Sequence, residues 1–492
     1  MKALSSQQVE IQPIETRRGG LSLTSLLLLS GLIAIAGPQM AEAQVLSVED
    51  VISLARQNSE TLQANEKTIE AITSEISGRD LALSWRLDAE VADARDQRDT
   101  LTPTQRFRTK LIDASLSKLF STGTQLGLSV GSEVTDLGAT GERNIGEWEL
   151  KLSQSLWRDG FGRSTSLRRE AERAELQSRT LTTLFQRQNL LVELESAYWD
   201  LALALREEEI RQGNIEKSEQ VERWTRDRVR RSVAESADLL QAQALTSNRQ
   251  LELISVRNRI ESLRNRFRQL IPNQNPEAWK IDLKSMEVIR PLDSLLASSS
   301  GTSIPFRLDS LSSRFLAEQA SAEASRVDEN LQPKLDAYVS HGQNGRDERF
   351  GAAWDRARDP EFSSTRIGVL FSMDLDSGLK EDQRRAARLN AESRSLEARA
   401  QERLSIVGWS DLNREIDSLK KQAEEANRLA DFQERKVAAE RNRYRLGRTT
   451  VFQLITFEID AANSKVELAR ILSNLRKAES RARVFTRQQD GV

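Results

Sequence analysis

Histidine and cysteine, two residue types that often act in catalysis or bind metals, are nearly absent from this sequence of 492 residues. It has one histidine, His341, four methionines and no cysteine, so neither a Cys/His pair nor a cluster of soft metal ligands can be assembled. The carboxylates are spread along stretches with helical periodicity, and no glycine-rich phosphate loop occurs. The sequence therefore predicts a protein without a catalytic site, a metal site or a cofactor.

The polar residues with the most informative spacing lie in two segments that repeat each other without a gap. Residues 226–270 overlay residues 441–485 at a constant offset of 215. The identical positions in the first copy are Arg226, Arg228, Arg230, Leu239, Asn248, Glu252, Leu253, Arg266 and Arg268. A repeat with so long a period indicates a duplicated domain rather than a short-repeat solenoid.

Long helices must position these duplicated segments. Residues 165–228 contain no proline and place leucine and alanine at alternating spacings of four and three, as residues 380–443 do again. This spacing is typical of coiled-coil packing, and 64 residues of helix extend about 95 Å. Shorter helices over 238–271 and 452–486 are expected to return along the rods, so that each repeated segment begins with a turn between two helices.

Segments with strand alternation interrupt the helical pattern. They are residues 85–96, 110–120, 125–134, 147–157, 334–341 and 366–375. In 147–157, for example, Trp148, Leu150 and Leu152 alternate with charged residues. A soluble sandwich would show the same alternation, but in an exported chain it also fits an outer-membrane β-barrel. Whether the pair within 110–134 joins such a barrel or forms an outer hairpin is left open.

The chain divides into five parts. Residues 1–43 have a positive start, an apolar run and an A-x-A site, which predicts a secretory signal peptide; a single membrane anchor is the alternative. Residues 44–271 and 304–486 form two structural repeats, each read as helix, strands, long helix, turn and helix. Residues 272–303 are a linker, and 487–492 are a tail. Beyond the signal, no apolar run reaches the roughly 18 residues of a membrane-spanning helix.

Three segments give the sequence a resemblance to the TolC family of outer-membrane efflux proteins. Residues 446–455 (LGRTTVFQLI) resemble the family's glycine-containing turn and the helix start that follows it. Residues 155–160 (SLWRDG) resemble its strand-to-helix segment, and residues 331–335 (LQPKL) resemble its helix-to-strand junction. The order and duplication of these segments carry the resemblance.

The resemblance implies a mainly α fold with duplicated coiled-coil hairpins, β-hairpins and a membrane β-barrel part. Three protomers would form a homotrimer, in which an α-helical barrel in the periplasm continues an outer-membrane β-barrel surrounded by lipid. The expected function is a passive exit duct for efflux or secretion, docked at its periplasmic tip to an adaptor (membrane fusion) protein and an inner-membrane pump. With 72 basic and 74 acidic residues, no nucleic-acid partner is expected.

The resemblance also implies which residues act at the periplasmic tip. The expected gate residues are Asp238, Gln453, Thr456, Tyr444, Ser232 and Gly447. The expected contacts with the adaptor are Arg230, Arg445 and Arg448. The family's inward aspartates after the second turn are replaced here by Gln453 and Thr456, so Asp238 could supply a single carboxylate ring instead.

Purely structural explanations compete with these roles. Gly447 suits a turn that needs a positive φ. Asp238 suits a helix N-cap or first turn, and the arginines suit a solvated tip. For the whole protein, the competing interpretation is a periplasmic coiled-coil adaptor or scaffold, which would have one helical hairpin beside compact β domains. The cargo and the class of transporter cannot be read from the sequence.

Overall fold

The computed structural model describes residues 45–96, 107–136, 141–272, 279–287 and 307–485. The predicted signal segment, the predicted tail and most of the predicted linker lie outside these ranges. The described residues are mainly helical and include one large antiparallel sheet, which confirms the expected fold class.

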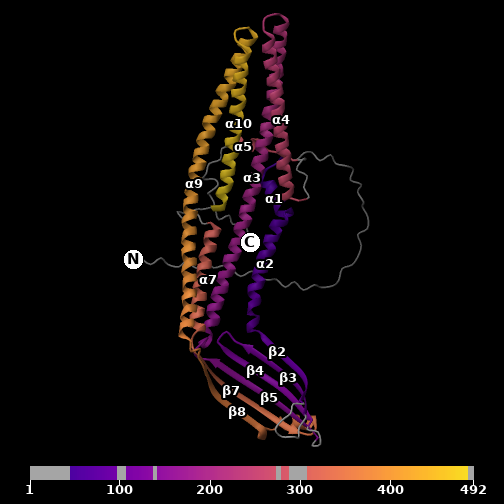
Figure 1. The fold of residues 1–492 in the computed structure, drawn as a ribbon, viewed down its shortest axis with the longest axis vertical. Coiled ribbons are helices and arrows are strands. Elements are labelled where there is room, and N and C mark those ends of the chain that lie inside the picture. The colour runs from indigo at the N-terminus through magenta and orange to yellow at the C-terminus, as the bar shows by residue number, and fades with distance from the viewer. Residues whose placement is uncertain (1–44, 97–106, 137–140, 273–278, 288–306, 486–492) are drawn as a thin grey trace, which may run out of the picture. The chain divides into compact units, whose positions relative to one another are not determined.

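Two helical hairpins contain the duplicated turns. In the first, α3 (Arg163–Arg230) turns into α4 (Ser236–Leu270); in the second, α9 (Ser377–Arg445) turns into α10 (Val451–Ala482). The long helices have 68 and 69 residues and therefore extend about 100 Å each. Both turns lie at the ends of the helices that are remote from the sheet (Figure 1).

The buried side chains of α9 recur every seventh residue, as expected for a coiled coil. One series contains Ile416, Ala423, Ala430, Val437 and Tyr444, and an earlier one contains Ala398, Ser405 and Leu412. The two series are joined by a step of four residues, from Leu412 to Ile416. Such a step locally unwinds a coiled coil. Near this step the packing partner of α9 changes. Gln401 bonds to Asp309 of α7 (Leu308–Asn330), whereas Leu412 and Ile416 cluster with Leu475 of α10.

The helix at the start of the first repeat is divided into two. Ser47 is the N-cap of helix α1 (Val48–Asn58), and its hydroxyl accepts the amide of Asp50 at 3.2 Å. Ser59 separates α1 from α2 (Glu60–Gly78).

A short parallel pair, not predicted from the sequence, links this segment to the linker. Strand β1 (Val45–Leu46) pairs with β6 (Lys280–Ile281), which the short helix α5 (Lys284–Glu287) follows. The largest core cluster lies beside this pair. Tyr198 of α3 is buried there and donates its hydroxyl to the carbonyl of Leu46 at 2.9 Å.

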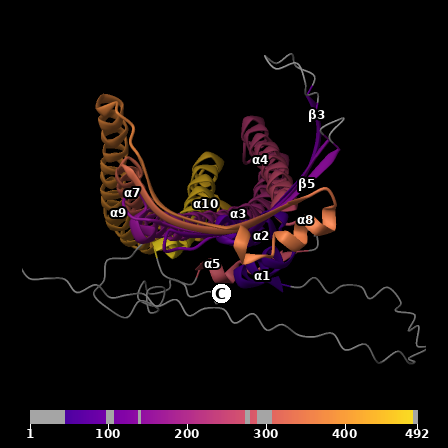
Figure 2. The same ribbon diagram turned by 90° about the horizontal axis from the view of Figure 1, so that it is seen from below.

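Six strands form one sheet, and neighbours in space are antiparallel. They are β2 (Trp85–Asp96), β3 (Phe107–Leu119), β4 (Thr124–Asp136), β5 (Glu142–Ser155), β7 (Lys334–Asp347) and β8 (Ser363–Ser372), in the spatial order β2-β3-β4-β5-β7-β8. The two strands within 110–134 are therefore members of the sheet, inserted between β2 and β5. Figure 2 shows the strands bending into an open trough.

The register separates an apolar face of the sheet from a charged face. On the apolar face, exposed side chains include Leu87, Val91, Ile112, Leu116, Leu128, Val130, Leu150, Leu152, Ile367 and Val369. On the opposite face lie Arg86, Asp88, Glu90, Asp113, Glu147, Glu149, Lys151 and Arg366. Because side chains alternate with a period of two, a slip of one residue would exchange the two faces.

A short helix that the sequence did not predict covers part of the apolar face. Helix α8 (Phe350–Arg356) follows β7, and the ring of Trp354 lies against Gly146 of β5. The indole of Trp148 donates to the carbonyl of Ala357 at 3.1 Å. The strand pattern of the sequence did not indicate this helix. The helix can lie against the sheet only because glycines of β5 and β7 leave room for it.

The two junction segments that carried the resemblance are hydrogen-bonded to each other. The amide of Leu156 donates to the carbonyl of Leu335 at 2.7 Å, and the amide of Arg158 donates to the carbonyl of Pro333 at 3.1 Å. These bonds continue the pairing of β5 and β7 to the base of the helices. The strand-to-helix passage of the first repeat and the helix-to-strand passage of the second are thus fixed together.

Candidate functional site at the paired helical turns

The two duplicated turns have the same backbone conformation although their residues differ. Ser232 has a φ of 59° in the first turn, and Gly447 has a φ of 73° in the second. In each turn the amide of this residue donates to the carbonyl three residues earlier, and the next amide donates to the carbonyl five residues earlier. These distances are 2.9 and 2.9 Å in the first turn and 3.0 and 2.9 Å in the second. Both helices therefore end in a Schellman motif.

The identity of the residue at the positive φ gives the turns different stability. A left-handed conformation costs an L-residue roughly 1–2 kcal/mol, whereas glycine adopts it readily. Gly447 thus fits its turn without strain, and Ser232 holds the same conformation at a cost. Gly447 therefore has the positive φ that the turn was expected to need. The strain at Ser232 was not anticipated from the sequence.

The aligned residues Asp238 and Gln453 both lie at the first turn of a returning helix. The carboxylate of Asp238 accepts the amide of Glu235 at 3.3 Å, and Asp238 is half-buried. The amide of Gln453 donates to the hydroxyl of Thr450 at 3.3 Å, and its side-chain oxygen accepts the hydroxyl of Thr449 at 3.2 Å. Each residue satisfies backbone or side-chain groups at a helix N-terminus, as the structural alternative for Asp238 requires.

Tyr444 links the two hairpins at this end of the helices. It is buried, and its hydroxyl lies 2.8 Å from the hydroxyl of Thr225 on α3. The guanidinium of Arg228 lies 4.8 Å from the centre of the Tyr444 ring and donates to the Tyr444 carbonyl at 3.1 Å. Apolar side chains from the other three helices of the hairpins cluster with Tyr444: Val221 of α3, Ala242 and Leu245 of α4, and Val451, Leu454 and Ile455 of α10.

The remaining expected tip residues are more exposed. Thr456 is half-buried and donates its hydroxyl to the carbonyl of Phe452 at 3.0 Å. Arg445 and Arg448 are exposed, as is Arg230, whose guanidinium lies 4.0 Å from a carboxylate oxygen of Asp227. The structure thus brings Tyr444 into the interior and leaves the three arginines on the surface.

A cavity of about 470 Å³ opens beside Tyr444 between the hairpins. It is lined by Trp224, Asp227, Arg228, Arg231, Tyr444 and Arg445. Thr225, Trp224 and the inward orientation of Arg228 were missed by the sequence analysis. The only available signal was their position at the start of the repeated segment: Trp224 and Thr225 directly precede it, and Arg228 is one of its identical positions.

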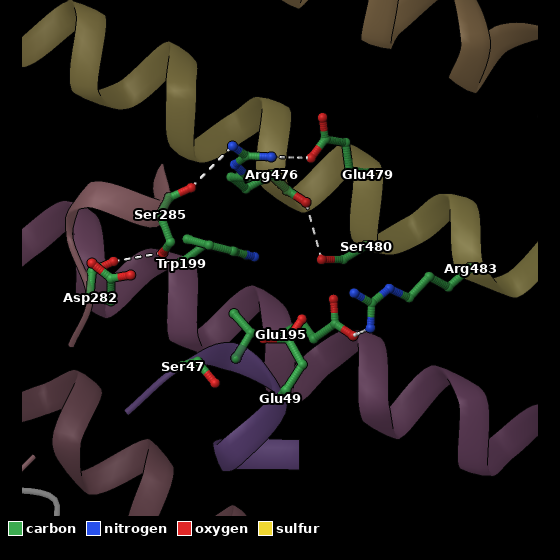
Figure 3. Close-up of a pocket in the computed structure, with 11 residues that line it drawn as sticks. Ser47, Glu49, Glu195, Trp199, Asp282, Ser285, Arg476, Glu479, Ser480 and Arg483 are labelled. Atoms are coloured by element: carbon green, nitrogen blue, oxygen red, sulfur yellow. Dashed lines mark hydrogen bonds and ion pairs between the residues drawn. The ribbon is translucent and has the colours of Figure 1, made fainter. Parts of the chain in front are cut away.

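A second polar cluster lies where α10 ends against α3 and α1 (Figure 3). A cavity of about 130 Å³ occurs there. Arg476 donates to Glu479 at 2.6 Å and to the carbonyl of Ser285 at 3.0 Å, and Arg483 donates to Glu195 at 2.6 Å. Arg476, Glu479 and Glu195 are buried, so these charges are stabilised by pairing rather than by water.

Burial governs the titration of this cluster. It raises the pKa of Glu195, while Arg483 and a hydrogen bond with Ser480 partly oppose the shift. Burial also raises the pKa of the neighbouring Tyr198 to about 12. The cluster joins the start of the first repeat, the described part of the linker and the end of the second repeat. Its residues were not among the candidates found in the sequence.

Two searches of the described residues gave negative results. No group of three or more histidine or acidic side chains in the described ranges could hold a metal ion. Among the helices that the structure describes, none is long and apolar enough to span a membrane.

The fold is that of known outer-membrane channels. The outer membrane protein VceC of Vibrio cholerae matches with a TM-score of 0.65 and 15% identity, over 89% of this chain and 95% of that one. The outer-membrane channel OprN has a TM-score of 0.65 and 16% identity, over 89% of each chain. The CmeC outer membrane channel of Campylobacter jejuni has a TM-score of 0.64 and 14% identity, over 90% of this chain and 87% of that one.

The sequence itself gives no comparable match. No family model and no curated protein matches it. At such low identities the structural likeness establishes the fold, which extends over nearly the whole length of the channel proteins.

Proposed function

We propose that this protein is the passive exit duct of an efflux or secretion system, formed by three copies in the outer membrane. The observation that carries the proposal is the division of the sheet into two faces. Leu87, Val91 and Ile367 on one face are 71%, 80% and 81% exposed. A contiguous apolar surface of this kind is costly in water and suits contact with lipid, while the charged face suits a water-filled lumen.

The helices support association of several copies. Along α9 the side chains of Leu389, Leu396 and Leu404 are 54–62% exposed, and Leu429 and Phe432 further along the same helix are 50% and 63% exposed. Exposed apolar residues also occur on α4, at Leu251 and Ile254. Since helices of this length need neighbours along their apolar sides, we assign these surfaces to contacts with adjacent copies. Three copies, as the resemblance implies, would close both the helices and the strands into a ring.

The arrangement along the axis gives the duct a direction. With the sheet in the outer membrane, the helices reach about 100 Å into the periplasm and place both turns at the far end. The buried Tyr444–Thr225 contact would hold the two hairpins together and keep this end narrow. The exposed side chains of Arg230, Arg445 and Arg448 would meet an adaptor protein that connects the duct to an inner-membrane pump.

The alternative function, a periplasmic scaffold or adaptor, has less support. That class is expected to have one helical hairpin beside compact β domains. Here two hairpins share one six-stranded sheet, and the solved structures with this fold are described as outer-membrane channels.

Two matched variants test the proposal, because adjacent residues of β5 point to opposite faces. Leu150→Arg places a charge on the lipid face, where arginine at the middle of a membrane costs about 2–4 kcal/mol. Glu149→Arg places the same charge in the lumen. We expect the first variant to lower the amount of trimer in outer-membrane fractions and the second to leave it unchanged. A native protein that fractionates as a soluble monomer, without conductance in planar bilayers, would contradict the proposal.

A further inference from the structure

The hairpin of β3 and β4 is an integral part of the sheet. All 12 residues of β2 have partners in β3, and all 13 residues of β4 have partners in β5. A hairpin packed loosely outside the sheet would not pair over the full length of strands on both of its sides.

The turn between β3 and β4 is also fixed to the base of β5. The side-chain amide of Gln154 donates to the carbonyl of Thr122 at 2.9 Å, and the hydroxyl of Thr124 donates to Gln154 at 2.6 Å. Gly162, at the start of α3, has no room for a side chain, because a Cβ there would collide with the carbonyl of Ser121. The insertion is therefore held at the junction between sheet and helices.

The two faces of the sheet continue through the hairpin without a break. Ile112 and Leu128 lie on the apolar face, in line with residues of β2 and β5, and are 56% and 39% exposed. Asp113 lies on the charged face, level with Glu90 of β2. The inserted strands thus have the same lipid-facing and lumen-facing sides as the other four.

The width of the helical layer and the width of the sheet in each copy provide a further argument. At the sheet end each copy has four helices, α2, α3, α7 and α9, of which neighbours pack together. Adjacent helices lie about 8–10 Å apart, so four occupy roughly 32–40 Å of circumference. Strands spaced about 4.8 Å and tilted by about 35–45° occupy roughly 6–7 Å each. Six strands therefore cover about 35–41 Å, whereas four would cover only about 23–27 Å.

We infer that all six strands of each copy form part of the wall of the membrane β-barrel, so that three copies close a barrel of eighteen strands. This inference rests on the proposed trimeric duct. Among the described strands, β2 and β8 each have one edge without a partner. They run in opposite directions, so β2 of one copy pairs with β8 of the next in the same antiparallel pattern. The barrel then has the circumference of the helical tunnel at an ordinary strand tilt.

Disulfide trapping in the full-length protein tests this seam, since the native sequence has no cysteine. Ala89→Cys on the lipid face of β2 is combined in turn with Ile367→Cys, Val369→Cys or Phe371→Cys on the same face of β8. Ala89→Cys with Leu370→Cys, on the opposite face, is the control. After oxidation of outer membranes, we expect one of the three same-face pairs to give covalent dimers and trimers, and the control to give none.

A further cysteine pair tests the arrangement in which the β3–β4 hairpin lies outside the barrel. Ala89→Cys with Leu150→Cys on β5 would bridge within one copy only if the β3–β4 hairpin lay outside the barrel. In the six-stranded order these strands are about 14 Å apart, beyond the reach of a disulfide. Counting strands in an electron cryomicroscopy map of the trimer in a lipid disc is the second measurement. Eighteen strands and a β2–β8 bridge support the inference; twelve strands with a β2–β5 bridge overturn it.

The same experiments separate this inference from the proposed function. A conducting trimer with twelve strands overturns the inference alone. A native chain that forms no trimer in the membrane overturns the proposed duct and the inference together.

Discussion

The hydroxyl oxygens of Tyr444 and Thr225 lie 2.8 Å apart, and this contact joins the second half of the duplicated chain to the first. The equivalent positions in the other copies of the repeat are Val229 and Glu440, which cannot form the same contact. The link therefore occurs once in each protomer. The two similar hairpins thus differ at this position, and the difference fastens one to the other near their turns.

Removing one hydroxyl of this pair should loosen the tip. Thr225→Val leaves the buried hydroxyl of Tyr444 without its partner, at a cost of about 1–3 kcal/mol. Tyr444→Phe removes the same link but costs less, because the hydroxyl of Thr225 still donates to the carbonyl of Val221 at 2.8 Å. If the link keeps the duct narrow, each variant should raise the single-channel conductance or the open probability in planar bilayers.

The double variant provides the control for that experiment. Replacing both residues leaves no orphaned hydroxyl, so its effect on stability should be smaller than the sum of the two single effects. Strict additivity of the two changes, in thermal unfolding of the purified protein, would show that the residues are not coupled.

The two turns should respond in opposite ways to exchange of their central residues. Ser232→Gly removes the left-handed strain and should stabilise the first turn, whereas Gly447→Ala introduces strain of roughly 1 kcal/mol into the second. There is open space around Gly447, so the alanine meets no steric clash. Hydrogen exchange of tip peptides measures both effects: protection should increase in the first case and decrease in the second. Equal protection in parent and variants would contradict the assignment.

Glu195 should make stability depend on pH. Because burial raises its pKa above the usual 4.5, the folded state binds a proton more tightly than the unfolded state does. The free energy of unfolding should therefore fall as the pH rises from about 4.5 through the raised pKa. Glu195→Gln stays neutral, so its thermal midpoint should match the parent near pH 4.5 and exceed it at pH 7.5.

Glu193→Gln is the matched control for that measurement. Glu193 lies on the same helix, and its side chain is 48% exposed, so the substitution should leave the pH dependence as it is in the parent. A lower midpoint for Glu195→Gln at pH 7.5 would mean that the ion pair with Arg483 outweighs the cost of burial.

The charged face of the sheet should make the duct prefer cations at its outer end. Two carboxylates converge over Gly131: a Cβ there would lie 2.9 Å from an oxygen of Asp113 and 3.6 Å from one of Glu147. Asp113→Asn combined with Glu147→Gln should shift the reversal potential in a KCl gradient toward zero. The measurement belongs at about 0.1 M salt, where screening extends over roughly 10 Å. Arg366→Gln should shift it the other way, and an unchanged potential in both variants would contradict the prediction.

Much of the fold follows from periodicity in the sequence. The strand predicted at 85–96 has the same bounds as β2, because its alternation is uninterrupted and a change to helical spacing precedes it. The rods at 165–228 and 380–443 were recognised from leucine and alanine spacing, and the structure extends each by only a few residues. Long, strongly periodic elements can be predicted because many residues repeat the same apolar spacing and so indicate the same buried face.

The rest depends on contacts between distant segments. Helix α8 is short, and its position is decided by space above Gly146 and Gly345 rather than by its own pattern. Tyr444 could be proposed as a link between helices, but its partner Thr225 could not, because only the packing of two hairpins brings them together. The left-handed Ser232 was also hidden, since serine rarely adopts that conformation.

The middle of the sheet has a consequence for how the chain folds. Leu150 of β5 pairs with His341 of β7, and the whole rod of α3 and its returning helix lie between them in the chain. The first four strands can pair as soon as they are made, but they expose an apolar face and the open edge of β5 until β7 arrives. Such an edge is prone to aggregation during folding. Pairing with the second repeat therefore protects the first repeat from aggregation. The chain is most prone to aggregate in the interval before β7 pairs with β5.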